Sequence, residues 1–296
     1  MPKIPYLGEG LSLLAAVLWA FAVIMFKKSG EKIHPLALNL FKNLLAFALF
    51  IPTILIFEGR LLRHVPLSDS AVLIASGALG IGIGDSLYLH SLNLIGAGLS
   101  AIVVCLYSPL IILLSVVVLG ESLSLIQLGG AGLIVLAIFV ATYERERSAP
   151  AKNLAAGIVF GILANVANAV SIVMAKRVLE RSPLFWTAEV RLLAGIVVLV
   201  LILAVLPGRR KIVAPLIVAE RWPVMIVGSL TGAYIAMMVW LAGMKFAPAS
   251  VASALNQTST IFIFIFAAFI LREPVTRKRV AGIVLAFIGV FLVSFG

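Results

Sequence analysis

Charged residues are scarce in this chain of 296 residues. Asp, Glu, Lys and Arg make up 12% of it, about half the share that is usual in soluble globular proteins. Hydrophobic residues make up 62%, more than a soluble fold of this length can hide. Because a helix that crosses a bilayer uses about 20 residues, ten such helices would absorb roughly 200 residues and leave short loops. The composition therefore predicts an all-α polytopic membrane protein.

Cysteine is nearly absent as well, and the motifs of common catalytic sites are missing. The single cysteine, Cys105, stands in an apolar run, which excludes a disulfide framework and a CxxC metal or redox site. The chain has no HExxH, no GxSxG, no Walker loop and no cluster of His and acidic residues at metal spacing. We therefore expect no enzyme, no metal, no cofactor and no ATP-driven pump within this chain.

The excess of positive charge does not indicate nucleic acid. The net charge is +11, but the basic residues are spread over separate short loops rather than gathered on one face. Of the 23 Lys and Arg, 14 follow odd-numbered hydrophobic runs, and 7 follow even-numbered runs or precede the first. Since cytoplasmic loops carry the excess of Lys and Arg, this bias predicts a cytoplasmic (inner) membrane protein with both termini outside and residues 209–211 in the cytoplasm.

Ten hydrophobic runs, separated by short clusters of charge, Pro and Gly, are the expected membrane spans. The first is longer than a signal-peptide core and is followed by Lys27 and Lys28 rather than by a cleavage site, so we interpret it as a retained helix. The ten ranges are 10–26, 35–57, 70–92, 97–119, 124–143, 153–175, 184–206, 222–244, 248–271 and 276–295.

The second half of the chain repeats the first. Pro35-Leu36 and Pro183-Leu184 open the second and seventh spans, and the residues after them correspond at an offset of 148. Glu121-Ser-Leu-Ser124 and Glu273-Pro-Val-Thr276 correspond at an offset of 152. Each of these two segments ends on a residue suited to an N-cap, and Ser124 with Gln127 fits a capping box.

The number of spans in each half fixes how the halves are related. Five is odd, so the second unit enters the membrane from the opposite side to the first. The sequence thus predicts ten transmembrane helices in two inverted five-helix repeats, residues 1–147 and 148–296. Secondary transporters are commonly built in this way, around a site near the middle of the membrane.

Four ionisable residues stand inside the expected spans: Lys42, Asp85, Glu189 and Arg191. Such residues are costly in a bilayer and face protein or water, so each is a candidate for a charge or coupling role. Asp85 is the first candidate for a carboxylate that binds and releases a proton, and Glu189 is the second. The alternative is structural, either an ion pair in which Arg191 or Lys42 holds Asp85 ionised, or snorkelling to the interface.

Two spans carry stripes of polar residues. Asn165, Asn168 and Ser171 recur every three residues in the sixth span, and the ninth carries a similar stripe. Such a stripe either lines an aqueous cavity or bonds helix to helix, and both interpretations stay open. Aromatic residues, Trp240 among them, offer stacking surfaces for a ligand or else form an interfacial belt. The substrate-cavity candidates are Trp19, Tyr88, Tyr107, Asn165, Asn168, Tyr234, Asn256 and Gln257.

Glycine and proline mark two further features. Gly77, Gly80, Gly82 and Gly84 crowd the third span, a pattern typical of close helix packing, with local flexibility as the alternative. Pro109 stands in the middle of the fourth span, where it removes a backbone hydrogen bond and is expected to kink the helix.

Several short motifs recur in the same order in both halves. The first half has 88–101, Tyr107-Ser-Pro-Leu110, 119–124 and 129–136, and the second has Trp240, Ala247-Pro-Ala249, Arg272-Glu-Pro274 and 282–285. Together with Trp19, Lys27 and Arg191, this order resembles two tandem EamA domains of the drug/metabolite transporter superfamily. The resemblance implies ten helices, an inverted pseudo-twofold and a central cavity lined chiefly by helices one, three, four, six, eight and nine.

The chain also departs from that family. Asn43 stands where the first repeat often has Arg, and Ile261 replaces the proline that would match Pro109. Many relatives are drawn with both termini inside, which conflicts with the distribution of Lys and Arg.

The resulting prediction is a secondary transporter, by family likeness an exporter, of a small metabolite such as an amino acid. It would work by alternating access around a central cavity. Proton coupling and the choice between monomer and dimer stay open. The expected partners are the small-molecule substrate and the lipid bilayer, with no nucleic acid. The alternative is a flippase for a lipid or lipid-linked carrier, which needs a basic pocket near one interface, for example at Lys42 and Arg191.

Overall fold

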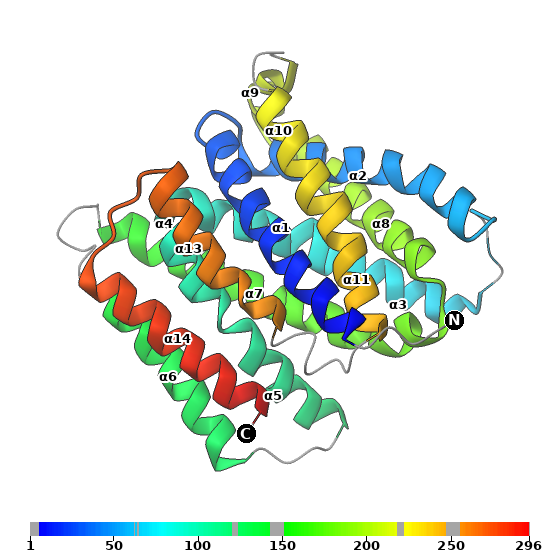
Figure 1. Cartoon of the computed structure of the whole chain (residues 1–296). Coiled ribbons are helices and arrows are strands. Elements are labelled where there is room, and N and C mark those ends of the chain that lie inside the picture. Colours follow the sequence, from blue (N-terminus) through cyan, green and yellow to red (C-terminus); the bar gives the residue numbers. More distant parts are fainter. Residues whose placement is uncertain are drawn as a thin grey trace.

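The computed structural model describes residues 6–61, 63, 65–119, 124–142, 151–217, 222–246 and 255–295, and within these ranges it contains helices and no strand (Figure 1). The helices of the first half are α1 (Leu7–Gly30), α2 (Pro35–Phe57), α3 (Leu67–Gly77), η1 (Ala78–Gly84), α4 (Asp85–Val104), α5 (Tyr107–Leu119) and α6 (Leu125–Thr142). Those of the second half are α7 (Ala151–Arg181), α8 (Leu184–Val205), α9 (Arg209–Val213), η3 (Ala214–Ile217), α10 (Trp222–Gly228), η5 (Ser229–Ala236), α11 (Met237–Phe246), α13 (Ser259–Ile270) and α14 (Arg277–Phe295).

The helices agree with a protein that crosses the membrane many times. Within the described residues, six helical stretches are long and apolar enough to span a bilayer, and 125–141 and 255–270 are shorter apolar helices. The second predicted span, 35–57, has the bounds of α2. The chain is thus a polytopic all-α membrane protein, while the number of ten spans stays a prediction.

The third and fourth predicted spans meet at Gly96. Helix α4 runs through this point, but Gly96 has φ 79° and ψ 171°, which breaks the helix into two. A left-handed φ favours glycine because it has no Cβ. The helix that begins after the break is capped by Glu273, whose carboxylate accepts from Ala97 N at 2.8 Å and from Gly98 N at 3.1 Å. Loops that are distant in the sequence therefore fix the start of the fourth span.

The fourth span is also interrupted where proline removes a hydrogen bond. Helix α4 ends at Val104 and α5 begins at Tyr107, leaving Cys105 and Leu106 in a turn. Pro109 lies in the first turn of α5, and it has no N–H to donate to the carbonyl four residues earlier, that of Cys105. The expected interruption is thus present, one turn before the proline.

The predicted helix caps are confirmed. Ser124 N donates to Gln127 Oε1 at 3.0 Å, and Gln127 N donates to Ser124 Oγ at 3.1 Å, which is the reciprocal pair of a capping box. At the matching place in the second half, Arg279 N donates to Thr276 Oγ1 at 3.3 Å. These local signals fix the starts of α6 and α14.

Two π-helices stand at matching places in the two halves. η1 covers Ala78–Gly84 and η5 covers Ser229–Ala236, so their bounds differ by 151 and 152 residues. π-Helical turns are rare and often mark functional sites. The glycines of the first allow close packing, as expected, because a Cβ on Gly77 would stand only 2.1 Å from Arg191 O of α8.

Helices α6 and α14 lie side by side, in green and red in Figure 1, and are antiparallel. A Cβ on Gly282 would touch Ala137 O and Ala141 Cβ, whereas a Cβ on Gly289 would touch Gly130 O. Gly282 follows Gly130 by 152 residues, and Gly289 follows Ala137 by the same number. The contacts are therefore reciprocal, as they are across a twofold axis.

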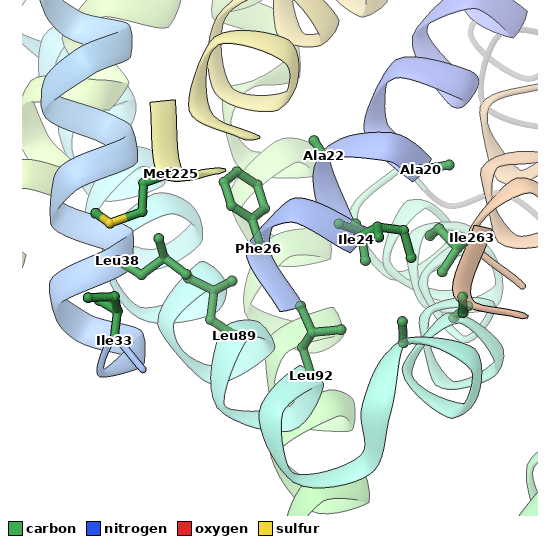
Figure 2. Packing of buried hydrophobic residues seen from close by; sticks show 14 of the residues in the cluster. Ala20, Ala22, Ile24, Phe26, Ile33, Leu38, Leu89, Leu92, Met225 and Ile263 are labelled. Carbon is green, nitrogen blue, oxygen red and sulfur yellow. The ribbon is translucent and has the colours of Figure 1, made fainter. Parts of the chain in front are cut away.

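Helix α1 has neighbouring helices in both halves of the chain. It packs against α4, α10, η5, α11 and α13. Figure 2 shows Phe26 of α1 among Leu38, Leu89 and Met225, which come from three different helices. This apolar cluster brings together helices of both halves.

Candidate functional site

An ion pair joins the second and third predicted spans. Lys42 Nζ of α2 lies 2.6 Å from Asp85 Oδ2, at the junction of η1 and α4. The Lys42 side chain is 10% exposed and the Asp85 side chain 29%. Asp85 is thus paired with Lys42 rather than with Arg191, and its coupling role stays a prediction.

Amide and hydroxyl groups extend this pair into a network around η1. Asn39 Nδ2 donates to Ile81 O at 2.9 Å and to Ser86 Oγ at 2.9 Å. Asn43 Nδ2 donates to Asn39 Oδ1 at 2.9 Å. The backbone of η1 thus has side-chain partners from α2. Sequence reasoning did not place Asn39 and Asn43 in the site, although their spacing of four residues puts them on one face of α2.

Arg191 lies on the other side of η1. Its Nη2 donates to Ser171 Oγ of α7 at 3.2 Å. Ser171 Oγ in turn donates to Ser76 O at 2.8 Å, and Ser76 Oγ donates to Ser171 O at 2.9 Å. Arg191 also interacts electrostatically with Asp85 and Tyr107. The structure therefore brings Lys42, Asp85 and Arg191 together around η1, and we name these three residues with Asn39, Asn43, Ser86 and Ser171 the η1 cluster. Tyr107 lies at the start of α5, which packs against α7.

The two asparagines predicted on the sixth span have different surroundings. Asn168 lies against η1, since a Cβ on Gly84 would meet its Nδ2 at 3.0 Å. Asn165 is buried, and its Nδ2 donates to Val103 O and to Gly161 O, both at 3.0 Å. Asn165 thus bonds α7 to α4, while Asn168 extends the η1 cluster.

The aromatic candidates fall in two regions of the molecule. The rings of Trp19 and Trp240 have centroids 6.2 Å apart and join α1 to α11. Tyr234 Oη of η5 lies 2.5 Å from Thr53 Oγ1 of α2, and its ring meets Phe50 edge-on. Tyr88 packs against the apolar cluster around α1. Tyr234 and Trp240 pack against the same apolar cluster, and Trp19 contacts Trp240. The structure thus brings Trp19, Trp240 and Tyr234 into one region, apart from Tyr88.

A few buried polar atoms have no hydrogen-bond partner among the described residues. They include Trp19 Nε1, both carboxylate oxygens of Glu189, Arg191 Nε and Asn256 Oδ1, with Ser29 Oγ and Arg63 Nε completing the set. Glu189 is 9% exposed. Leaving such groups unpaired costs about 1–3 kcal/mol each, and more for a charged group. Five of these seven atoms belong to residues that the sequence singled out, on α1, on α8 and just before α13.

Two glutamates that sequence reasoning did not assign to the site hold helix starts. Glu58 Oε1 accepts from Phe185 N at 2.9 Å, and Glu58 Oε2 accepts from Trp186 N at 3.2 Å. Glu273 caps the helix after Gly96 in the same way. Carboxylates are favourable at helix N-termini. In the described part of the chain, no three His, Cys, Asp or Glu side chains gather in a way that could hold a metal.

Both halves of the chain match the model of the EamA-like transporter family, over residues 6–143 and 155–295. An uncharacterized transporter of Archaeoglobus fulgidus is 27% identical over 285 residues, which cover 95% of this chain and 96% of that protein. The uncharacterized transporter YetK of Bacillus subtilis is 30% identical over 125 residues, 42% of this chain and 36% of that protein.

The fold is shared with a solved crystal structure that is 18% identical. The match covers 96% of this chain and 95% of the chain in that structure, with a TM-score of 0.69. The double family match and the transporter relatives point to a membrane transporter rather than an enzyme. The chain belongs to the EamA-like transporter family.

Proposed function

We propose that this protein is a secondary transporter that exports a small polar or amphipathic metabolite, such as an amino acid. It works by alternating access between two inverted five-helix repeats, residues 1–147 and 148–296, which together form ten transmembrane helices. The antiparallel, reciprocal packing of α6 and α14 supports the inverted relation. So does Glu58, which stands at the C-terminus of α2 and caps the N-terminus of α8, because these two helices correspond in the repeat.

The contacts between loops support the same topology. Lys27 Nζ after the first predicted span donates to Asn93 O after the third, at 3.0 Å. Glu273, after the ninth, bonds the backbone that follows the third. Asp69 pairs with Arg181, and both lie where loops follow even-numbered spans. In each of these bonds, the two partners lie in loops that both follow odd-numbered spans or both follow even-numbered spans. Such loops lie on the same side of the membrane, because consecutive spans cross it in opposite directions.

The observation that carries the function is the set of buried polar atoms that have no hydrogen-bond partner in the part of the chain that the structure describes. Trp19 Nε1 is a donor and Asn256 Oδ1 is an acceptor, while Arg191 Nε and the Glu189 carboxylate are the charged members of the set inside the expected spans. A transporter must bind its substrate and then release it, so its binding groups must leave some bonds to be completed by the substrate. Neutral and charged hydrogen-bonding groups, together with the indole pair of Trp19 and Trp240, suit a small amphipathic molecule.

For proton coupling, we propose Glu189 ahead of Asp85. Asp85 is neutralised by Lys42, whereas Glu189 is buried without a partner in the described structure. An ionised carboxylate buried in this way is costly, and protonation removes the charge. Helix α8 packs against α2, α3 and η1. The charged residues on these helices are Lys42, paired with Asp85, and Asp69, paired with Arg181. Arg191 lies on α8 itself.

The flippase alternative requires that the basic residues predicted for its pocket, Lys42 and Arg191, be uncompensated. Lys42 is paired with Asp85, and Arg191 bonds Ser171 within reach of the same carboxylate. The charge of the η1 cluster is therefore partly cancelled, which favours the metabolite transporter over a carrier of anionic lipid-linked groups.

A counterflow screen in liposomes tests the function. The purified protein is assayed with amino acids, nucleosides, sugars and organic cations, with and without a pH gradient. Asn256→Ala and Trp19→Phe are expected to lower transport of the accepted substrate at least about tenfold, the effect of losing roughly one buried hydrogen bond. Asn153→Ala is the matched control, because Asn153 is exposed on α7. No counterflow with any class, or equal rates for all three variants, would contradict the proposal.

The coupling role is tested on Glu189→Gln, which keeps the shape of the side chain and removes its proton equilibrium. Substrate-driven proton movement is expected to stop while substrate exchange continues. Glu31→Gln is the control, since Glu31 is exposed beyond α1. Unchanged proton movement in Glu189→Gln would show that coupling lies elsewhere or is absent.

We also propose that Asn165, Asn168, Asn256 and Gln257 face the transport pathway in at least one state. Each is replaced singly by Cys after Cys105 is changed to Ser, and a membrane-impermeant thiol reagent is applied with and without substrate. Reaction that substrate slows supports the assignment. If none of the four reacts in any condition, the lining assignment is wrong.

The orientation is part of the same proposal, with both termini outside the cytoplasmic membrane. A single cysteine placed in the loop at Arg210 is expected to react with the impermeant reagent only after the cells are opened. Labelling in intact cells would reverse the orientation.

A further inference from the structure

A groove lies between the last turns of α8 and the short helices α9 and η3, away from the η1 cluster. Its volume is about 530 Å³, within the size range of pockets that hold small ligands. Six of its eight lining residues are apolar, among them Val200, Leu203 and Ile217. The other two are Arg209 and Arg210. The groove therefore combines an apolar wall with a basic end.

The groove lies where a membrane-spanning helix reaches the interface. Helix α8 is long and apolar enough to span a bilayer and ends at Val205. The run Arg209-Arg-Lys211 follows within four residues. Trp222 begins α10, and its indole Nε1 donates to Leu216 O of η3 at 2.7 Å. Tryptophan and basic residues are typical of the membrane interface.

Arg209 is positioned at the basic end of the groove. Its Nη1 donates to Ala204 O at the end of α8, at 2.5 Å. A guanidinium carries five N–H donors in a fork that matches phosphate oxygens, so one bond to a carbonyl does not exhaust it. The eight lining residues carry two positive charges and no negative one.

We propose that this groove binds an anionic phospholipid of the surrounding bilayer. The phosphate lies at Arg209 and Arg210, and an acyl chain lies along Val200 and Ile217, which are 49% and 78% exposed. Basic pockets beside membrane helices recognise anionic lipid headgroups in this way. A soluble anion would occupy only the basic end of the groove and leave the apolar wall uncovered. A phospholipid covers both parts, so the apolar wall favours a lipid over a soluble anion.

The test uses the full chain reconstituted in phosphatidylcholine vesicles with increasing fractions of brominated phosphatidylglycerol or brominated phosphatidylcholine. Bromine quenches nearby tryptophan, and the part of the quenching that is lost in Trp222→Phe reports on the groove. Brominated phosphatidylglycerol is expected to quench Trp222 at a lower fraction than brominated phosphatidylcholine. The double variant Arg209→Gln, Arg210→Gln is expected to weaken this preference by up to about thirtyfold.

A second pair of variants separates the lipid from a general charge effect. Arg277→Gln with Lys278→Gln removes two exposed basic residues at the start of α14, and is expected to leave the preference unchanged. Ile217→Gln alters the apolar wall without changing charge, and is expected to raise the fraction of brominated phosphatidylglycerol needed. Equal quenching by the two lipids, an equal loss in the α14 control, or displacement by inorganic phosphate would each overturn the proposal.

Discussion

The π-helices η1 and η5 have corresponding packing and different chemistry. η1 packs against α7 and α8, and η5 packs against α1 and α2. A Cβ on Gly80 would meet Ser171 Oγ at 2.4 Å, and a Cβ on Gly232 would meet Ala22 Cβ at 2.6 Å. Gly232 follows Gly80 by 152 residues, and Ser171 follows Ala22 by 149. The two halves thus use the same backbone contact with different side chains.

The difference lies in charge. Lys42 and Asp85 pair beside η1, while the positions 148 and 152 residues later hold Val190 and Met237. Tyr234 with Thr53 provides a polar contact beside η5. The repeat thus preserves backbone contacts, while apolar residues in the second half replace the Lys42–Asp85 pair of the first. The proposed transport site between the two halves is thus chemically asymmetric, although the halves repeat the same backbone contacts.

The largest effect is expected at a glycine whose counterpart is not glycine. Gly77→Ala would place a Cβ 2.1 Å from Arg191 O, a backbone atom that cannot turn away, so we expect a loss of about 3 kcal/mol in unfolding free energy, the upper end for overpacking. Ser229 is the matching residue, and Ser229→Ala removes only its bond to Met225 O, about 1 kcal/mol. Both are measured by unfolding in mixed micelles, and equal losses would show that α3 and α8 pack less closely than described.

Breaking the ion pair is expected to have an effect of similar size. Lys42→Val alone leaves the Asp85 carboxylate without its cation and is expected to cost about 3 kcal/mol, the lower end for breaking a buried pair because Asp85 is partly exposed. The double variant Lys42→Val, Asp85→Met copies the second half of the protein. It is expected to lie within about 1 kcal/mol of the native protein, because a buried pair can be replaced by apolar residues.

The transport rate of this double variant tests whether the ion pair has a role in function. If it is stable and still transports at the native rate, the pair is dispensable and the asymmetry of the two halves is not functional. If it is stable and inactive, the pair serves the site.

Ser171 faces Gly80, and Ala22 faces Gly232. Substitutions of these two residues are expected to change the unfolding free energy moderately. Ser171→Ala removes bonds to Ser76 and Arg191, with an expected loss of about 2 kcal/mol. Ala22→Ser is the matched change beside η5, where a smaller loss is expected because no buried partner is left unpaired. The double variant Ser171→Ala, Ser76→Ala is expected to lose less unfolding free energy than the sum of the losses in the two single variants. Full additivity of the two single effects would contradict a shared network.

The polar contact beside η5 is expected to matter less. Tyr234→Phe removes the bond to Thr53 Oγ1 and keeps the ring against Phe50, for an expected loss of about 1 kcal/mol. The double-mutant cycle with Thr53→Val measures the coupling. A coupling energy near zero would mean that the two hydroxyls do not bond.

The smallest effect concerns how the matching helices α2 and α8 begin. Glu58 caps α8, whereas His34 Nδ1 accepts from Leu36 N at 3.3 Å to cap α2. Burial, and then the neighbouring His90, lower the pKa of His34 below 6.5. Its neutral form therefore stabilises the fold fully above pH 6.5, and this stability is lost as the pH falls through the lowered pKa. The expected contribution is about 0.5 kcal/mol.

His34→Asn keeps a capping side chain that does not titrate in this range. It is expected to flatten the stability profile between pH 5 and 7, measured as the unfolding midpoint at each pH, while Glu31→Gln leaves the profile unchanged. An identical slope in His34→Asn and the native protein would remove His34 as the cause.

Local signals in the sequence determined much of the frame. Hydrophobic runs placed α2 between Pro35 and Phe57, and Ser124 with Gln127 fixed the start of α6, because apolar length and capping act within a few residues. The doubled motifs indicated the family, since each half repeats the same order. These features do not depend on which helices become neighbours.

The tertiary structure alone decided how the polar residues are used. The sequence could not assign Lys42 rather than Arg191 to Asp85, because the choice depends on how closely α2, α8 and η1 pack. It could not show that Glu58 and Glu273 cap helices far along the chain, or that the Glu189 carboxylate has no hydrogen-bond partner among the described residues. The energy of a charged or polar side chain in a membrane protein depends on the atoms within a few ångströms of it, and those atoms come from distant parts of the sequence.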